Sequence, residues 1–437
     1  MQPPKLEKRP KKHKFHTYVI EDNWNYLEED WQEIVKDTKK LPKKIADYIA
    51  DENKYANEYL KDTKEIQDIL WKIHRGRIKE DETSVEIKNK DYFYYSRYRK
   101  KNKNQGHYAI TCRKYKSMEA PEEIIYDGDD EAKGNKYFSH TTALSLNQDK
   151  LAIGTDKIGN EEYLMIIRDI KTKKILTKHP IKTSSNFFFA KNDWLYYTIL
   201  SEERRPFQLK RHTLGDDPKN DIIIYTEKDP SFFVSAGLSH DDRFVYLESS
   251  QHDTDEIFFF ECDEKSPKPR LIKKRELDFE YDVSYHPESN SFFILTNKDK
   301  AVDYKIMKVN TKNPEVENWK TFLEHKPGRL ILGIMIIKGW LIKSVRDNFK
   351  EEIIATNLNT NEEHKIEFEN EEDCSIGVSP TAVDYDSNDW IRVGFSSMKT
   401  ESRVYDYNCR TKELVLKKKQ TIPSGHDNTQ YETKRIL

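Results

Sequence analysis

Four adjacent residues near the end of the chain include the side-chain types of a serine-hydrolase triad. They are Ser424, Gly425, His426 and Asp427. In a working triad the histidine takes a proton from the serine while the acid orients the histidine, and the three groups converge from distant loops. Adjacent residues cannot line up in this way, so we interpret the segment as a turn between domains.

A serine nucleophile also needs a tight elbow, with glycines two residues before and two residues after it. No two of the 14 glycines stand four residues apart, so the common form of this elbow is absent. No alternation of strands and helices, which would mark a hydrolase fold, follows the repeats described below. We therefore predict that this chain contains no catalytic residue.

Three polar groups could hold a metal ion in principle. The first matches the start of a calcium loop but lacks the glycine that must follow, and we interpret it as a polar turn: Asp384, Asp386 and Asn388. The second is a run of carboxylates that we expect in a solvated loop: Asp127, Asp129, Asp130 and Glu131. The third, His13 and His16, has no nearby thiol. We predict no metal site.

Phosphate and nucleic-acid binding receive little support either. Two glycine pairs have the outer spacing of a phosphate-binding loop but lack its lysine: Gly154 with Gly159, and Gly328 with Gly333. The basic run 100–103 is balanced by acidic runs such as 367–373, and the formal net charge is −2. A solvated surface explains these runs better than nucleic-acid contact. We predict neither a cofactor nor a nucleic-acid partner.

The composition describes a folded chain with a strongly charged surface. Charged residues make up 35% of the 437 positions, yet aromatic residues reach 12%, far above what disordered chains carry. The basic N-terminus is not followed by an apolar run, and the longest apolar stretch, 330–342, is too short to cross a bilayer. Isolated thiols suit a reducing compartment, so we predict a cytoplasmic protein without a membrane partner; they are Cys112, Cys262, Cys374 and Cys409.

The elements that would position any site fall into two regions. Residues 1–80 show helical spacing over 30–37, 41–60 and 63–75, with apolar stripes that need a partner. If that partner is absent, we expect exposed apolar side chains and early proteolysis of residues 1 to about 75. The residues expected at this surface include Ile45, Ile49, Ile66 and Ile69.

From residue 81 to 420, one strand-rich unit returns about every 45 to 50 residues. Each copy alternates apolar strands with short polar turns, and a sheet of this size buries both faces only by stacking on its neighbours. The copies lie near Tyr92, Ala143, Phe187, Val234, Val283, Leu330 and Ser379. We predict a mainly β fold, a seven-bladed β-propeller with an N-terminal α-helical arm. Residues 421–437 would begin the crossing to a further domain.

Several short sequence motifs are more specific than this repeat. They run in order along nearly the whole chain: 51–55, 75–81, 94–99, 227–234, 292–297, 396–400, 404–407 and 419–427. Together they resemble the oligopeptidase B group of the prolyl oligopeptidase family of serine peptidases. Glu401 follows Thr400 where that family usually has proline, which puts only one turn in question.

The resemblance implies an N-terminal helical arm, a seven-bladed propeller and a crossing into an α/β-hydrolase domain. It implies hydrolysis of short peptides after Arg or Lys through an acyl-enzyme, with the propeller restricting access. The family's triad belongs to the hydrolase domain, so no site residue is carried over to this sequence. We expect a substrate-gating propeller portion, inactive alone, whose partner is a separately encoded hydrolase half and whose ligands after assembly are short basic peptides. The alternative is a non-enzymatic binding module or the remnant of a decaying gene.

Overall fold

The computed structural model describes residues 2–28, 33–34, 37–99, 108–368, 373–385, 389–434 and 436. Most of the helix expected over 30–37 and the basic run 100–103 lie outside these residues. So do Asp386 and Asn388 of the polar turn that resembles a calcium loop.

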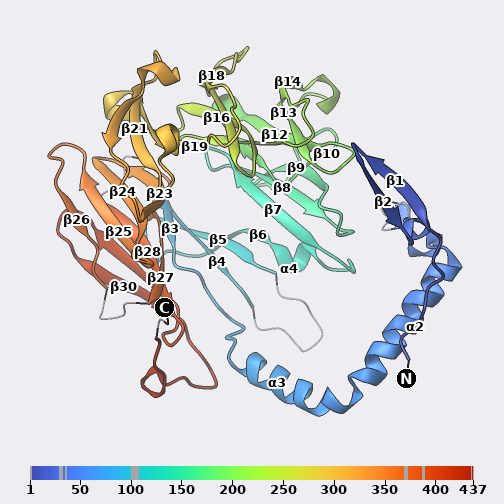
Figure 1. The fold of residues 1–437 in the computed structure, drawn as a ribbon. Helices are drawn as coiled ribbons and strands as arrows, with labels where there is room; N and C mark the ends of the chain where they lie inside the picture. The colour runs from blue at the N-terminus through green and yellow to red at the C-terminus, as the bar shows by residue number, and fades with distance from the viewer. Residues whose placement is uncertain are drawn as a thin grey trace.

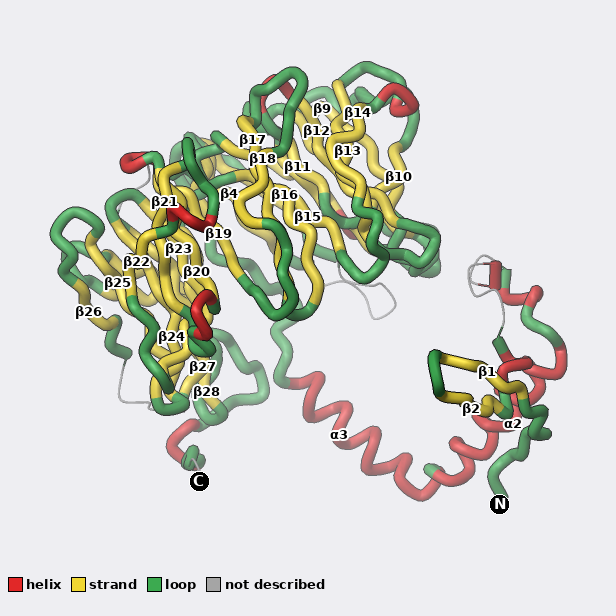
Figure 2. The backbone as a smooth tube through the Cα atoms, turned by 45° about the horizontal axis from the view of Figure 1, so that its top comes forward, coloured by secondary structure: helices red, strands yellow, loops and turns green. Residues whose placement is uncertain are grey.

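The N-terminal region forms an arm that leaves the rest of the molecule (Figure 1, Figure 2). It contains two helices, α2 (Lys43–Tyr59) and α3 (Lys64–Gly76), close to the ranges expected. It also contains a hairpin of β1 (Lys11–Phe15) and β2 (Tyr18–Asp22), which the sequence analysis did not predict. Lys44 of α2 lies 3.6 Å from the Glu7 carboxylate, which links this helix to the chain that leads into the hairpin.

The remaining strands form seven four-stranded antiparallel sheets, each a meander of strands consecutive in sequence. The propeller fold and the presence of N-terminal helices are therefore confirmed. Blades 1 to 4 comprise β3 (Ile87–Asn89), β4 (Tyr92–Arg97), β5 (Ile110–Tyr115), β6 (Glu123–Asp127); β7 (Ser139–Leu144), β8 (Lys150–Asp156), β9 (Tyr163–Asp169), β10 (Ile181–Thr183); β11 (Phe187–Phe189), β12 (Trp194–Leu200), β13 (Pro206–Thr213), β14 (Ile222–Thr226); β15 (Phe233–Leu238), β16 (Phe244–Gln251), β17 (Thr254–Glu261) and β18 (Arg270–Lys273). Blades 5 to 7 comprise β19 (Tyr281–His286), β20 (Ser291–Thr296), β21 (Lys305–Asn310), β22 (Lys320–Leu323); β23 (Arg329–Ile337), β24 (Trp340–Asp347), β25 (Lys350–Asn357), β26 (Glu363–Lys365); β27 (Cys374–Pro380), β28 (Trp390–Ser397), β29 (Arg403–Asn408) and β30 (Leu414–Lys419).

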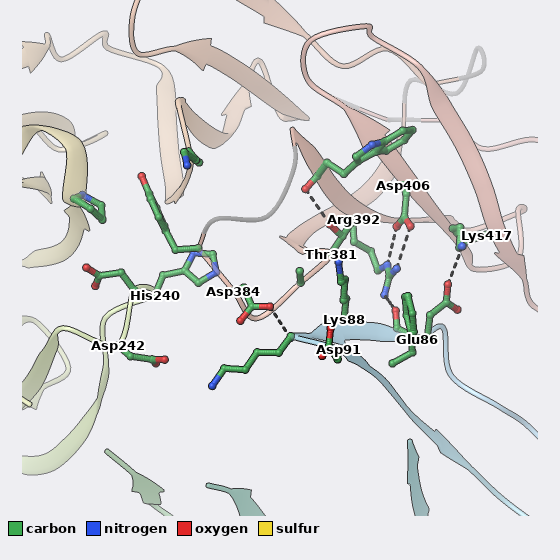
Figure 3. Close-up of a pocket in the computed structure, with 18 of the residues that line it drawn as sticks. Glu86, Lys88, Asp91, His240, Asp242, Thr381, Asp384, Arg392, Asp406 and Lys417 are labelled. Atoms are coloured by element: carbon green, nitrogen blue, oxygen red, sulfur yellow. Dashed lines mark hydrogen bonds and ion pairs between the residues drawn. The ribbon is translucent and has the colours of Figure 1, made fainter. Parts of the chain in front are cut away.

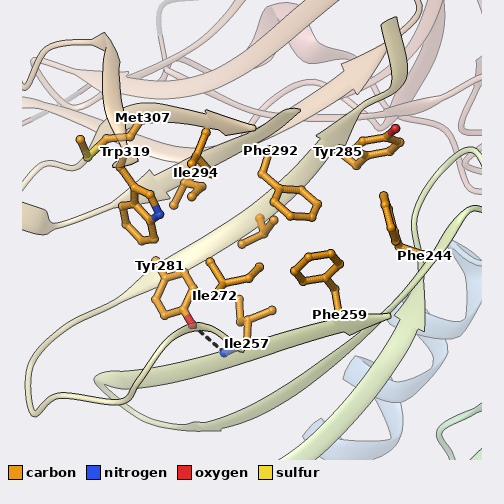
Figure 4. Packing of buried hydrophobic residues seen from close by; sticks show 12 residues of the cluster. Phe244, Ile257, Phe259, Ile272, Tyr281, Tyr285, Phe292, Ile294, Met307 and Trp319 are labelled. Atoms are coloured by element: carbon orange, nitrogen blue, oxygen red, sulfur yellow. Dashed lines mark hydrogen bonds between the residues drawn. The ribbon is translucent and has the colours of Figure 1, made fainter. Parts of the chain in front are cut away.

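Apolar side chains fill the interfaces between successive blades. Between blades 4 and 5, Phe259 and Phe292 pack edge to face with ring centroids 4.9 Å apart, and Phe244 and Trp319 belong to the same cluster (Figure 4). Equivalent buried clusters join blades 1 and 2, 2 and 3, 3 and 4, 5 and 6, and 6 and 7. Burying one such side chain stabilises the fold by about 1.5–3 kcal/mol, so stacking is what holds each sheet.

The interface between blades 7 and 1, which we call the seam, is built differently. Among the residues that the structure describes, no buried apolar cluster is shared by these two blades. Instead, Lys88 N donates to Thr381 O over 3.3 Å and Val383 N donates to Lys88 O over 2.8 Å. Ion pairs and hydrogen bonds to charged groups also join the two blades: Lys417 with Glu86 (2.9 Å), Lys418 with Glu82 (2.7 Å), Arg392 with Glu86 O (2.6 Å) and Lys90 N with Asp384 (2.6 Å).

The meander defines two ends of the propeller. In an antiparallel meander of four strands, the first strand begins and the fourth strand ends on the same side. The arm therefore enters, at β3, on the side where the chain leaves after β30, and we call this side the arm face. The turns between the first and second strands of every blade lie on the opposite side. The expected domain borders at 80 and 420 fall beside Gly76 and Lys419, and the division into domains stays a prediction.

Candidate functional site

In the structure the histidine and the acid of the triad-like segment have other partners. The Nε2 atom of His426 lies 2.6 Å from the carbonyl oxygen of Lys399. Asp427 accepts hydrogen bonds from the backbone and the hydroxyl of Thr429, and so caps a short 3₁₀ turn. The segment is exposed. None of these bonds joins the histidine or the acid to Ser424, as proton transfer along a triad would require.

The acidic run at 127–131 is not the solvated loop that we expected. It forms a short helical turn, α4 (Gly128–Glu131), in which the Asp127 carboxylate accepts from Asp130 N. Asp129 is only 4% exposed and accepts from Tyr108 N over 2.9 Å. Glu131 pairs with Arg168 over 2.7 Å. Asp130 and Glu131 are exposed as expected, but the prediction was wrong for Asp129, which is buried, because sequence spacing does not reveal its partner in the chain before β5.

The other weak motifs also have structural roles. Gly154 lies inside strand β8, where an added Cβ would meet the Phe187 ring at 2.8 Å, so the glycine permits close packing and begins no loop. His13 stacks against Phe15 within the arm hairpin. Asp384 accepts from Lys90 N over 2.6 Å. Within the described ranges, no group of three or more His, Cys, Asp or Glu side chains could hold a metal ion.

The buried cysteines offer no activated thiol. Cys112, Cys262 and Cys409 are buried, and all four cysteines are free of disulfides. Burial raises the pKa of Cys112 to about 11 and that of Cys409 to about 12. A nucleophilic cysteine needs a lowered pKa, so these thiols pack as small apolar groups. No helix in the part of the chain that the structure describes is long and apolar enough to cross a membrane.

A cavity of about 1290 Å³ lies at the end of the propeller opposite the arm face. Its walls come from turns between the first and second strands of five blades and from strand residues at the seam. Because blades 1, 4, 5, 6 and 7 all contribute, it lies at the mouth of the central channel. These turns supply Lys90 and Asp91, His240 to Asp242, Pro287 and Glu288, Lys338, and Thr381 to Tyr385.

Charges divide this cavity into two sides (Figure 3). On the seam side, Arg392 pairs with Asp406 over 2.8 Å and Lys417 pairs with Glu86. On the opposite side lie His240 and Asp242, whereas Asp384 lies at the seam and accepts a hydrogen bond from Lys90 N of blade 1. Burial raises the pKa of Asp242, and the neighbouring carboxylates of Asp241 and Asp384 add to that shift.

Sequence reasoning did not identify these cavity residues as functional. The segment His240–Asp241–Asp242 looked like any polar turn between strands of a blade. This segment forms a cavity wall only together with turns from four other blades, and only the closed ring brings those turns together. No pattern within one copy of the repeat could have revealed it.

A second surface, on the arm, is apolar and exposed. Helix α3 has no buried residue; Ile66 is 56% exposed and Ile69 is 48% exposed. Leu70 and Ile73 extend the same stripe, and Ile49 of α2 is also exposed, whereas Ile45 is half-buried. Three of the four residues expected to be exposed are therefore exposed. Stripes of this kind normally pack against another surface.

Comparisons with known proteins agree with this architecture. The sequence profile of the family described as "Prolyl oligopeptidase, N-terminal beta-propeller domain" matches residues 3–420. Dipeptidyl aminopeptidase BI of Pseudoxanthomonas mexicana is 23% identical over 99% of this chain and 60% of its own length. Protease 2 of Moraxella lacunata is 23% identical over 100% of this chain and 61% of its own length.

Among solved structures, oligopeptidase B from Leishmania major superposes with a TM-score of 0.89 at 20% identity, covering 100% of this chain and 63% of that one. At this identity the likeness supports the fold alone. The chain spans 60% and 61% of the two curated relatives' lengths.

Proposed function

Because the chain belongs to the prolyl oligopeptidase family through its N-terminal β-propeller domain, we propose that it is the access-limiting portion of an oligopeptidase B-like serine peptidase. This membership confirms the family resemblance inferred from the sequence motifs that occur in order along the chain. In the proposed assembly, the propeller covers the active site of an α/β-hydrolase domain and admits only short peptides. Cleavage follows Arg or Lys through an acyl-enzyme.

The observation that carries this proposal is the unpartnered apolar stripe of α3 beside the arm face. The stripe stands next to the point where the chain enters the propeller, and a Cβ added at Gly76, at its end, would lie 3.8 Å from the Cβ of Ser424 in the segment after the last blade. A hydrolase domain seated on the arm face would cover both the channel mouth there and this stripe. The free energy gained would come from removing Ile66, Ile69 and Leu70 from water.

We further propose that the chain alone does not turn over peptides, because the sequence has no glycine-flanked serine. The test assays the purified chain with fluorogenic Arg and Lys peptide amides. No turnover is expected. Addition of a separately produced oligopeptidase B hydrolase domain is expected to restore cleavage after Arg and Lys. Turnover by the chain alone, abolished by a serine-directed inhibitor, would contradict the proposal.

The docking surface can be tested separately by calorimetric titration with that hydrolase domain. Ile69→Asp places a charge in the apolar stripe and is expected to weaken association at least tenfold, since a buried unpaired charge is costly. Gln67→Asp makes the same charge change beside the stripe on the same helix and should leave association nearly unchanged. Equal effects of both variants would show that the stripe is not the docking surface.

A second candidate function, a binding module without a hydrolase partner, is favoured by the cavity at the opposite mouth of the channel. Affinity capture that recovers a stable partner other than a hydrolase, with α3 variants having no effect, would support it. For either function we propose a cytoplasmic location, because cysteines that form no disulfide suit a reducing compartment.

A further inference from the structure

The outer strand of blade 3 contains no charged residue. The first strands of neighbouring blades lie beside one another, with β11 between β7 and β15, so the first strand of each blade faces the channel and the fourth forms a free edge at the rim (Figure 1). Every other outer strand of the seven sheets contains a Lys, Arg, Asp or Glu residue; these strands are β6, β10, β18, β22, β26 and β30. Strand β14 consists of three isoleucines, a tyrosine and a threonine.

The lack of charge leaves the β14 edge open to pairing. Charged residues on an edge strand oppose association with another edge, because pairing would remove them from water. In β14, Ile222 is 44% exposed and Ile223 is 56% exposed. A bulge interrupts the pairing of β13 with β14, but the same irregularity occurs beside β6, β18, β22 and β30 and does not distinguish blade 3. Of the outer strands, β14 is therefore the one best suited to receive a further strand.

Buried carboxylates hold both ends of β14 in place. Asp221, just before the strand, accepts from the Tyr197 hydroxyl over 2.8 Å and lies 2.8 Å from Nδ1 of His212. Its side chain is 1% exposed. Glu227, just after the strand, pairs with Arg275 over 2.5 Å, and its side chain is 6% exposed. Both carboxylates are therefore turned away from the free edge, and a strand fixed at both ends loses little conformational freedom when it pairs.

The sequence of β14 is complementary to an antiparallel copy of itself. In the register centred on Ile224, Ile223 faces Tyr225 of a second copy. Ile222 then faces Thr226, so every pair within the strand is uncharged. Pairs of aromatic and β-branched side chains are favourable across antiparallel strands. A second copy of this chain therefore provides a strand that fits the edge.

Charges that flank β14 favour the same register. Lys219 and Asp229 lie equally far from Ile224 along the chain, so the pairing brings Lys219 of each copy opposite Asp229 of the other. Both residues are exposed, and their opposite charges attract. The like charges that this register also brings opposite each other, Asp221 and Glu227, are already bound inside the propeller. The flanking charges therefore complement the apolar strand.

From these observations we infer that the chain forms a two-fold symmetric homodimer, in which β14 of each copy pairs antiparallel with β14 of the other and the two third blades share one sheet. Backbone hydrogen bonds between the two edges supply the affinity. Because the same surface serves both copies, the assembly closes at a dimer. The inference goes beyond the proposed function, since pairing at the rim of blade 3 leaves the arm face available to a hydrolase domain.

Sedimentation velocity of the purified chain over a wide range of concentrations tests this inference. We expect a reversible monomer–dimer equilibrium, and dimerisation weakened at least tenfold by Ile223→Lys, which gives β14 a charge like those of the other outer strands. Ile175→Lys makes the same change at a side chain of blade 2 that is 54% exposed, and should leave dimerisation unchanged. A chain that is monomeric at every concentration, or equal losses in both variants, would overturn the inference. Dimers lost in Ile69→Asp but kept in Ile223→Lys would assign the association to the α3 stripe and overturn it as well.

A charge exchange tests the register. Lys219→Glu should weaken dimerisation about fivefold, because it places two carboxylates opposite each other. Adding Asp229→Lys to this variant should restore dimerisation, since the exchanged residues again have opposite charges. Both positions lie outside the strand, so these variants also serve if Ile223→Lys fails to fold. A double variant that dimerises as weakly as Lys219→Glu alone would refute the proposed pairing.

Discussion

Six of the interfaces between blades and the seam between blades 7 and 1 close the same ring by different means. The six interfaces share buried apolar clusters, whereas the seam is held by two backbone hydrogen bonds and a small set of ionic contacts. Partly exposed ion pairs contribute about 0–1 kcal/mol each and respond to salt, while one buried aromatic contributes about 1.5–3 kcal/mol. The blades therefore form a closed ring, but their interfaces contribute unequally to the free energy of unfolding. The interface that contributes least, the seam, lies beside the cavity.

The sharpest way to break this comparison is to remove an apolar anchor. Phe292→Ala should lower the free energy of unfolding by about 3–5 kcal/mol, because Phe292 is fully buried between blades 4 and 5 and leaves a cavity. Urea denaturation followed by circular dichroism measures this. Phe349→Ala, at a side chain 71% exposed, is the control and should cost under about 0.5 kcal/mol. Similar losses in both variants would show that the apolar clusters do not dominate.

A smaller loss is expected at the seam. Arg392→Ala should cost about 1–3 kcal/mol, because it leaves the Asp406 carboxylate, 15% exposed, without its partner and removes the bond to Glu86 O. The double variant with Asp406→Ala should cost less than the sum of the two single changes, as a double-mutant cycle in urea would reveal. Arg410→Ala, at a side chain 71% exposed on the same blade, is the control. Additive single effects would refute the coupling.

Salt should separate the two kinds of interface without mutation. At 1 M NaCl the Debye length falls to about 3 Å, so the Lys417–Glu86 and Lys418–Glu82 pairs weaken. Hydrogen exchange at the Val383 amide should then accelerate roughly 1.5- to 5-fold relative to 0.1 M NaCl. The Phe292 amide, inside an apolar interface, should not accelerate. Equal acceleration at both amides would mean that the seam is no more salt-sensitive than its neighbours.

The pH response should be the smallest effect and should differ in sign between the two regions. Burial raises the pKa of Asp255 from 3.8 to about 6, so its favourable contribution to folding is complete below pH 3.8 and is lost as pH rises through 6. Asp255→Asn should therefore raise Tm by about 1–3 °C at pH 7.5 and leave it unchanged near pH 4.

At the seam, burial opposes the effect of Lys417, yet the pKa of Glu86 is lowered from 4.5. Its contribution is present above pH 4.5 and disappears as pH falls below that value. Exchange at the Val383 amide, corrected for intrinsic rates, should therefore accelerate in acid. Acceleration towards alkaline pH instead would contradict this assignment.

Much of the fold could be predicted because the strand pattern is local. The segments near Phe187, Val234 and Val283 each alternate apolar strands with polar turns, and the structure has strands β11, β15 and β19 at these positions. The apolar stripe of α3 could be predicted for the same reason, because helical spacing is also a local pattern. The arm hairpin was missed because residues 11–22 are mostly exposed and lack the apolar alternation of a blade strand. Asp129 was misjudged because its carboxylate accepts from the backbone of Tyr108, which is far from it in sequence.

The sequence by itself determined that this chain stacks about seven antiparallel sheets and carries an apolar helical stripe, since both features follow from periodicity within a few turns or strands. The structure decided that the stripe is exposed. Only the tertiary structure decided that blades 7 and 1 meet through charges and that His240, Asp242 and Asp384 share one cavity. Those relations join residues from opposite ends of the repeat array, such as Lys88 and Thr381. They exist only when the blades close around a common axis. The sequence of one repeat reflects the contacts with its neighbours along the chain and does not show how the first and last blades meet.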